Sequence, residues 1–419
     1  MSNLSTETKA TLLEEAKRCL QCKVPRCKKA CPILTDIPMV MELFLDGKDE
    51  EAGAVLFENN PLSAICSIVC PHENNCYGNC VLGVKQQPIP FFKIEQYLSG
   101  KYLDQFDCAK PEKNGKRIAI VGAGPAGISM SILLAQKGFQ VTLMEEQEQI
   151  GGVLRYGIPD FRLPRERVDA CREILRKLGV TVKPNCYIGS NVSIDDMFMD
   201  GYNAVFLAVG TAKPNRLGLL GETLGHVHFA IDYLKSPKVH ELGKNVVVIG
   251  AGNVAMDVAR TAIRMVEDAN VTVINNRREQ DVTATNEEFS MAVEEGVTFL
   301  HQKAVLRITE TGVICAEVEV TETENGDVLY EENMMSRQVI EADSVILAIG
   351  QGPKSAPSGE MQIATTLRGL FVVDENGMTN IPGVFAAGDV VSGPKTVVEA
   401  VAYTKKVAEK IEQYCFKEV

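Results

Sequence analysis

RIAIVGAGPAGISMSILLAQKGFQVTLMEE, residues 117–146, is the stretch that decides the fold. An apolar strand (Ile118–Val121) leads into the glycine motif GAGPAG (Gly122–Gly127), a helix follows, and a second strand ends at Glu145. In such a βαβ unit the glycines allow a tight turn, a close approach of the backbone to a pyrophosphate, and close packing of helix on strand. The helix amino terminus favours the anion, and the acidic residue binds the ribose hydroxyls. The stretch therefore predicts a dinucleotide-binding domain.

The same pattern returns at residues 244–279, which read KNVVVIGAGNVAMDVARTAIRMVEDANVTVINNRRE. Here the motif is GAGNVA (Gly250–Ala255), and the second strand ends in Asn-Asn-Arg277-Arg278 in place of a carboxylate. An acid would repel a 2′-phosphate, whereas arginines pair with it, so this site is predicted to prefer NADPH over NADH. A solvated basic turn is the alternative. Two such units in one chain predict two bound dinucleotides.

Eight of the 13 cysteines lie before residue 81, in two runs. The runs are Cys19-x2-Cys22-x4-Cys27-x3-Cys31-Pro32 and Cys66-x3-Cys70-Pro71-x4-Cys76-x3-Cys80. Both contain a Cys-Pro pair. In bacterial ferredoxins the cysteine of this pair binds the second cluster instead of the one bound by the three cysteines before it. Eight sulfurs suit two 4Fe–4S clusters. Structural zinc is the alternative, since C-x2-C also begins many zinc sites. We favour two iron–sulfur clusters.

Composition limits the classes of protein to consider. The chain has 419 residues, 45% of them hydrophobic, which is enough for two or three domains. Its net charge of −12 argues against a nucleic-acid groove or an anionic membrane surface as partner. The amino terminus has no apolar signal core, and no run of about 18 uncharged apolar residues is present, so a cytoplasmic protein is expected. In a reducing cytosol, cysteines are metal ligands or buried thiols.

The carboxyl-terminal segment Ile381–Ile411 reads IPGVFAAGDVVSGPKTVVEAVAYTKKVAEKI and indicates a flavin site. Asp389 ends a strand and precedes a helix, where it is placed to accept hydrogen bonds from a flavin's ribityl chain. The helix beginning near Thr396 would point its free N–H groups at the flavin ring.

These motifs, together with IGGVLRYGIPDFRLP (Ile150–Pro164), resemble those of flavin-dependent enzymes of the pyridine-nucleotide disulfide reductase type, without their redox C-x4-C pair near the first unit. With both cysteine runs, the whole chain is similar to the electron-input part of dihydropyrimidine dehydrogenase, a separate subunit in bacteria, and equally to the glutamate synthase small subunit. The resemblance implies an α/β fold with two Rossmann-like domains after an α-helical iron–sulfur domain. The expected boundaries are 1–114 for the helical domain, 115–213 with 352–419 for the FAD domain, and 214–351 for the NAD(P)H domain.

The resemblance also implies which residues hold the nucleotides. FAD would be held by Gly122, Gly124, Ala126, Gly127, Glu145, Val153, Arg162, Asp389, Thr396 and Val397. The pyridine nucleotide would contact Gly252, Asn253, Val254, Arg277, Arg278 and Gly350. Dihydropyrimidine dehydrogenases have a further arginine a few residues after the basic pair, but here residues 281–285 read DVTAT, which weakens the expected NADPH preference.

The ligands of the two clusters are predicted differently by counting and by resemblance. Counting sulfurs alone gives two all-cysteine clusters and makes Cys66 a ligand. The resemblance instead implies Cys19, Cys22, Cys27 and Cys80 for one cluster, and Cys31, Cys70, Cys76 and a downstream glutamine for the other. Counted without a gap, this glutamine is Gln96, and Cys66 is then a packed thiol. We expect the set with Gln96.

The cofactors together predict the function. A hydride from NAD(P)H would pass to FAD, and single electrons would pass through two 4Fe–4S clusters to a larger catalytic reductase subunit, with FMN as its candidate cofactor. No catalytic side chain is expected, because the chemistry belongs to the flavin. A dihydropyrimidine dehydrogenase type is expected, with the glutamate synthase type or another reductase complex as the alternative. A non-catalytic docking subunit stapled by zinc is the alternative from a different class.

Overall fold

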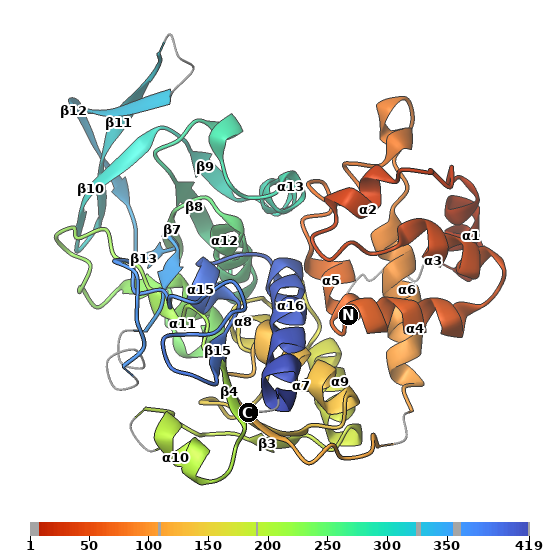
Figure 1. Cartoon of the computed structure of the whole chain (residues 1–419). Helices are drawn as coiled ribbons and strands as arrows, with labels where there is room; N and C mark the ends of the chain where they lie inside the picture. The colour runs from red at the N-terminus through yellow and green to blue at the C-terminus, as the bar shows by residue number, and fades with distance from the viewer. Residues whose placement is uncertain (1–7, 108–109, 190–191, 324–327, 355–361, 418–419) are drawn as a thin grey trace. The chain divides into compact units, whose positions relative to one another are not determined.

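The computed structural model describes residues 8–107, 110–189, 192–323, 328–354 and 362–417 (Figure 1). The chain divides into two compact units. The first unit comprises Met1–Arg155, Asp160–Thr211 and Gly352–Val419, and the second comprises Tyr156–Pro159 and Ala212–Gln351.

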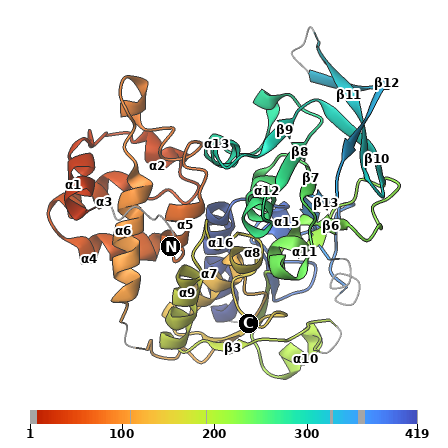
Figure 2. The same ribbon diagram turned by 180° about the vertical axis from the view of Figure 1, so that it is seen from behind.

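In residues 8–107, the amino-terminal part of the first unit, all regular secondary structure is helical (red to orange in Figures 1 and 2). Its helices are α1 (Lys9–Lys17), α2 (Arg26–Ala30), α3 (Ile37–Leu45), α4 (Asp49–Asn59), α5 (Ser63–Val69), the 3₁₀ turn η1 (Val81–Val84) and α6 (Phe91–Asp104). Leu12, Phe44 and Leu98 belong to one buried core in which the longer helices pack. Burial would raise the pKa of Asp49, but hydrogen bonds from Lys9 and Lys101, at 2.8 and 2.9 Å, hold it below its ordinary value. These ion pairs join α1, α4 and α6 around one buried carboxylate.

The rest of the first unit is a five-stranded parallel sheet with helices, in the order β15-β4-β1-β2-β3. The strands are β1 (Arg117–Val121), β2 (Gln140–Met144), β3 (Thr181–Lys183), β4 (Ala204–Leu207) and β15 (Val384–Ala386). The helices are α7 (Pro125–Gln136), α8 (Val153–Tyr156), α9 (Arg165–Lys177), α10 (Ile194–Met199), α15 (Asp389–Ser392) and α16 (Val397–Phe416). β1 is central and fully buried after its first residue, as a strand covered on both faces must be.

The helical part and this sheet belong to the same unit and are in direct contact. The ammonium of Lys405, on α16, donates to the backbone oxygen of Asn59 at 3.1 Å and to its side-chain oxygen at 2.9 Å. α5 also contacts α16 and α9. The cysteine-rich helices are therefore held against the flavin-type sheet.

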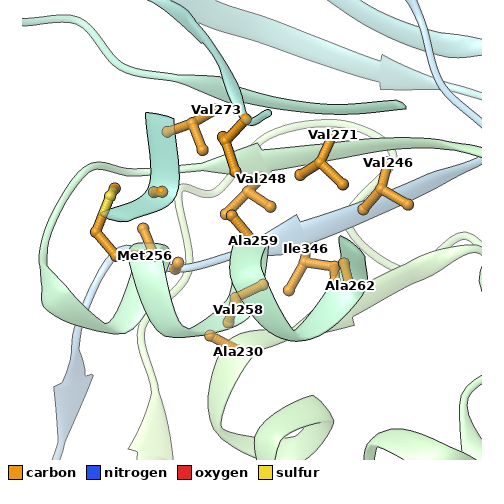
Figure 3. Close-up of a cluster of buried hydrophobic side chains, with 14 of the residues drawn as sticks. Ala230, Val246, Val248, Met256, Val258, Ala259, Ala262, Val271, Val273 and Ile346 are labelled. Atoms are coloured by element: carbon orange, nitrogen blue, oxygen red, sulfur yellow. The ribbon is translucent and has the colours of Figure 1, made fainter. Parts of the chain in front are cut away.

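The second unit repeats the parallel sheet, in the order β6-β13-β7-β8-β9. Its elements are β6 (Val227–Phe229), α11 (Ala230–Lys235), η2 (Pro237–Val239), β7 (Asn245–Ile249), α12 (Asn253–Met265), β8 (Asn270–Ile274), η3 (Glu279–Asp281), α13 (Asn286–Glu294), β9 (Thr298–Leu300) and β13 (Ser344–Leu347). Valines of the strands and alanines of α12 form its core (Figure 3). An antiparallel sheet follows, made of β10 (Lys303–Thr309), β11 (Gly312–Glu322) and β12 (Val328–Glu341). β5 (Lys213–Pro214) and β14 (Gln351–Gly352) form a two-stranded sheet.

No described helix is by itself long and apolar enough to cross a bilayer. The helices α4 and α5, which are bent by 83° at the break between them, reach the required length and composition only as a pair.

Candidate redox site

The three glycines of the turn after β1 have two different roles. Gly122 has φ +96°, and a Cβ there would lie 2.4 Å from the carbonyl oxygen of Ala208. A Cβ at Gly127 would lie 1.8 Å from the oxygen of Gly122. A Cβ at Gly124, in contrast, would meet only the Cα of Gly152, at 4.0 Å. The first and third glycines are thus required by the fold, whereas the second leaves open space at the amino terminus of α7, where a pyrophosphate fits.

The predicted FAD residues after β2 and β15 lie beside this turn. Glu145 is buried, and its carboxylate accepts the N–H of Ala123 at 2.7 Å and that of Gln147 at 2.9 Å. Burial raises the pKa of Glu145. A Cβ at Gly388, the residue before Asp389, would lie 3.1 Å from the Cβ of Ala126. The segments that carry Glu145 and Asp389 therefore meet at the start of α7.

The amino terminus of α16 is held in place by two carboxylates. Asp389 accepts the N–H of Lys395 at 3.2 Å, and burial raises its pKa to about 6. Glu399 accepts the N–H of Thr396 at 3.0 Å, and the Thr396 hydroxyl accepts the N–H of Glu399 in return. This capping box orients the first turn, so that Val397 stands at the first position of a 20-residue helix.

Val153 and Arg162 complete the residues predicted for FAD. Val153 begins α8 and is 38% exposed. It follows Gly152, whose Cβ would lie 2.8 Å from the Cα of Gly124, so this loop packs directly on the glycine turn. Arg162 is half-buried in the loop that precedes α9.

Alanine substitutions at Gly122 and Gly124 are expected to separate folding from cofactor binding. Gly122→Ala should destabilise the protein by about 3 kcal/mol, because the positive φ is strained for alanine and its Cβ meets a fixed carbonyl. Gly124→Ala should leave the thermal midpoint of the FAD-free protein unchanged but weaken FAD binding. Thermal unfolding without FAD and a flavin titration measure the two effects. Equal destabilisation by both substitutions would contradict this division.

The second glycine turn has the same geometry. Gly250 has φ +118°, and a Cβ there would lie 2.4 Å from the oxygen of Ala348, whereas one at Gly252 would meet only the Thr283 hydroxyl at 3.4 Å. The side chain of Asn253 accepts the N–H of Thr285 at 2.9 Å. Val254 follows in the first turn of α12, and Gly350, with φ +90°, lies in the turn after β13. The residues predicted for the pyridine nucleotide thus surround the amino terminus of α12 and the end of β13.

The two arginines after β8 have different surroundings. Arg278 donates to Asp281 at 2.5 Å and to Glu322 at 2.6 Å. The hydrogen bond from Arg278 lowers the pKa of Asp281. Arg277 instead lies 5.3 Å from the ring centroid of Tyr330. Arg278 is therefore already neutralised by carboxylates, whereas among the described residues Arg277 has an aromatic partner and no ion pair.

The first cysteine group surrounds a cavity within the helical part. Its lining is Cys19, Leu20, Cys22, Pro25, Arg26, Cys27, Pro38, Cys80, Val81, Leu82 and Ile89. The four cysteines are the ones predicted to share a cluster. We call this space the outer cavity.

A second cavity holds the remaining cysteines. Its lining is Cys31, Ile33, Thr35, Ile37, Asn60, Cys66, Cys70, His72, Asn75, Cys76, Phe91, Glu95 and Val398. Gln96, predicted as a ligand, is absent from this lining, and the preceding residue Glu95 is present in its place. Cys66 does line the cavity and is hydrogen-bonded to Cys70. We call this space the inner cavity, because Val398 belongs to α16 of the flavin-type sheet.

Burial controls the protonation of the groups around both cavities. It raises the pKa of Cys19, that of Cys27 to about 11, and that of Glu95 well above its ordinary value. Burial also lowers the pKa of His72 to about 4, which leaves its imidazole neutral at pH 7. The thiols of Cys19 and Cys27 therefore stay protonated at neutral pH unless a cationic centre replaces their protons, as iron or zinc does.

The two cavities are joined by short stretches of chain. Cys27 lines the outer cavity and Cys31 the inner one, and α2 connects them. Cys76 lines the inner cavity and Cys80 the outer one, and the chain between them forms turns. Four residues of a helix such as α2 advance about 6 Å, so the two thiol-lined spaces lie close together.

Two nucleotide-binding sheets and two thiol-lined cavities in one chain define an oxidoreductase that combines flavin, pyridine nucleotide and iron–sulfur chemistry. The chain belongs to the pyridine nucleotide-disulphide oxidoreductase family, which it matches over residues 72–192 and 116–403. Residues 2–105 match the family described as dihydropyrimidine dehydrogenase domain II, 4Fe-4S cluster. The expected α/β fold with an amino-terminal iron–sulfur domain is confirmed.

Curated relatives match nearly the whole chain. The glutamate synthase (NADPH) small chain of Escherichia coli K12 is 32% identical over 95% of this chain and 90% of its own. The NAD-dependent dihydropyrimidine dehydrogenase subunit PreT of Salmonella typhimurium is 31% identical over 96% of this chain and 94% of its own. Both resemblances stated from the motifs are thereby confirmed.

Solved structures share the fold at lower identity. FprA from Mycobacterium tuberculosis has a TM-score of 0.63 at 17% identity and covers 71% of this chain and 84% of its own. A complex of 2-naphthoyl-CoA reductase has a TM-score of 0.58 at 20% identity and covers 90% of this chain and 49% of its own. At these identities the likeness concerns the fold alone.

Proposed function

We propose that this chain is the electron-input subunit of a larger reductase, oxidising NAD(P)H and supplying single electrons through two 4Fe–4S clusters. When bound, FAD supplies the conversion between a two-electron hydride and the single electrons that iron–sulfur clusters accept. One observation carries the proposal: the inner cavity is lined both by cysteines and by Val398, one residue after Val397 at the start of α16. Thiols and the predicted flavin-facing helix thus share one space.

The test uses the purified full-length holoprotein. We expect FAD, about eight iron atoms per chain with equivalent acid-labile sulfide, and NAD(P)H oxidation in the presence of the neutral quinone menadione. Protein purified without flavin, or with zinc in place of iron, would contradict the proposal.

A zinc-stapled docking subunit is less well supported by the arrangement of the thiols. Structural zinc needs four ligands converging at about 2.0–2.3 Å on one ion. Within the described ranges, no group of three or more histidine, cysteine, aspartate or glutamate side chains is placed to hold a single metal ion. Thiols that line cavities suit a cluster with several irons.

We further infer that the inner cavity binds its cluster through Cys31, Cys70, Cys76 and Glu95. Glu95 is buried and lines the cavity, whereas Gln96 is half-buried and does not line it. Successive residues of a helix point about 100° apart, so only one of the two can face the thiols. Cys66 then supports the site as a hydrogen-bonding neighbour of Cys70.

A dihydropyrimidine dehydrogenase-type partner is the one we propose, with the glutamate synthase type as the alternative. The chain covers 94% of the PreT relative from Salmonella and 90% of the glutamate synthase small chain from E. coli. Reconstitution decides between them: the chain is combined with the catalytic subunit of each enzyme. We expect NAD(P)H-dependent reduction of uracil with the first, and no glutamate formation with the second.

We propose NADPH as the preferred nucleotide, recognised through Arg277. Arg277→Ala should raise KM for NADPH about 10-fold, equivalent to about 1.4 kcal/mol, and leave KM for NADH nearly unchanged. Arg278→Ala should affect both nucleotides alike, because Arg278 holds η3 and β11 together through Asp281 and Glu322. Steady-state kinetics with both nucleotides measure these effects. An NADPH-specific loss in Arg278→Ala with none in Arg277→Ala would reverse the assignment.

A further inference from the structure

Exposed apolar side chains from two segments, the loop between α1 and α2 and the turn η1, flank the outer cavity. Leu20 lines the cavity and is 57% exposed. Val24, between cavity residues Cys22 and Pro25, is 61% exposed, and Val84, which ends η1, is 70% exposed. The lining of the inner cavity, in contrast, includes Val398 of α16. Among the described residues the outer cavity is lined by the helical part alone, and the exposed apolar side chains lie in or beside the segments that form its lining.

The same surface is cationic, although the chain as a whole is acidic. Residues 17–29 contain six lysines and arginines and no carboxylate, whereas the net charge of the chain is −12. Three of the six are paired, in Lys17–Glu14, Arg18–Glu15 and Lys28–Asp36. Among the residues described, Lys23, Arg26 and Lys29 have no ion-pair partner, and neither does Lys85, which follows Val84. All four are exposed. The positive charge is thus free to act on a partner.

We propose that this surface, Leu20, Val24 and Val84 with the rim Lys23, Arg26, Lys29 and Lys85, docks the acidic face of a one-electron redox protein. This inference rests on the proposed function and names the chemistry of the partner. An apolar centre with a charged rim is the usual anatomy of a transient interface. Complementary charge steers association and is weakened by salt. Each NAD(P)H oxidised yields NAD(P)⁺, a proton and two electrons, which reduce two equivalents of the acceptor.

The test compares two protein acceptors and one small acceptor, using the full-length holoprotein. Cytochrome b5 is an acidic haem protein, cytochrome c is basic, and menadione is neutral and small. We expect cytochrome b5 to be reduced faster than cytochrome c, with a rate that falls as ionic strength rises. Lys23→Glu/Lys85→Glu should lower the cytochrome b5 rate about 10-fold at low salt and leave menadione reduction unchanged.

The matched control is Lys110→Glu/Lys113→Glu, which changes the net charge equally. Lys110 and Lys113 are exposed and precede β1, outside both cavity linings. The control should reduce cytochrome b5 as the wild type does. Equal rates for the wild type and Lys23→Glu/Lys85→Glu would overturn the docking proposal while menadione reduction persists. Loss of menadione reduction by the wild type would overturn the proposed function itself. If size-exclusion chromatography shows that the wild type self-associates and Lys23→Glu/Lys85→Glu does not, the surface belongs to a second copy and the proposal is overturned.

Discussion

Glu95→Ala is expected to remove one iron–sulfur cluster, about four iron atoms per chain, whereas Gln96→Leu keeps both. Glu95 lines the inner cavity with Cys31, Cys70 and Cys76, and burial raises the pKa of its carboxyl group. An iron centre in this cavity would supply the positive charge that stabilises a buried carboxylate. Iron and acid-labile sulfide analysis, with electron paramagnetic resonance (EPR) spectra of the reduced protein, measures the result.

Two further variants separate a ligand from a packing residue. Glu95→Gln should retain the cluster with an altered potential, because a neutral carbonyl replaces a carboxylate and the site loses one negative charge. Cys66→Ala should retain both clusters, since its thiol is assigned to a hydrogen bond with Cys70. Cluster loss in Cys66→Ala together with an unaffected Glu95→Ala would establish an all-cysteine set and refute the Glu95 assignment.

The nucleotide turns could be read from the sequence because every determinant is local. The positive φ of Gly122 and Gly250, and the open space at Gly124 and Gly252, arise within one βαβ unit each. Strand, turn and helix are consecutive in the chain, and the glycine spacing itself encodes the turn. The two parallel sheets followed from the same patterns, whereas the helical region before them was implied by the family resemblance.

The ligand that follows the cysteines in the sequence, and that completes the inner cavity, could not be predicted from local patterns in this way. A stretch of 14 residues separates Cys80 from Glu95, and it includes η1 and an irregular segment before α6. A single insertion or deletion in such a segment shifts a gapless count by one residue, and one residue on a helix rotates the side chain by about 100°. Counting gave Gln96, whereas the cavity is lined by Glu95.

The contacts of Arg277 and Arg278 could not be predicted from the sequence either. The partner Glu322 lies on β11, and Tyr330, which donates to Asp281 at 2.6 Å, lies on β12. Both are more than 40 residues away from Arg278, and their proximity depends on how the antiparallel sheet packs. Residue types near a strand end predict a phosphate-binding pair, but only the tertiary structure shows that Arg278 is already engaged.

Removing a thiol from the outer cavity and removing one from the inner cavity should affect the reduction of the remaining cluster by NAD(P)H differently. Cys22→Ala removes a thiol of the outer cavity, and NAD(P)H should still reduce the inner cluster at a nearly unchanged rate. Cys76→Ala removes a thiol of the inner cavity, and NAD(P)H should then reduce the outer cluster at least about 100-fold more slowly, although dithionite still reduces it. Anaerobic rapid mixing with NAD(P)H, followed by EPR spectroscopy, measures both rates.

The expected order follows from which cavity the flavin-type sheet borders. Val398 lines the inner cavity, whereas the outer cavity is lined only by residues between 19 and 89. The outer thiols connect to the inner ones through Cys27–Cys31 and Cys76–Cys80, so electrons from the flavin side meet the inner cluster first. Cys76→Ala should therefore interrupt the route through the inner cluster, while Cys22→Ala removes the far end of that route. The order is the reverse if Cys22→Ala blocks reduction of the inner cluster and Cys76→Ala leaves the outer cluster fully reducible by NAD(P)H. In that case the outer cavity, with its apolar and cationic rim, faces the electron source.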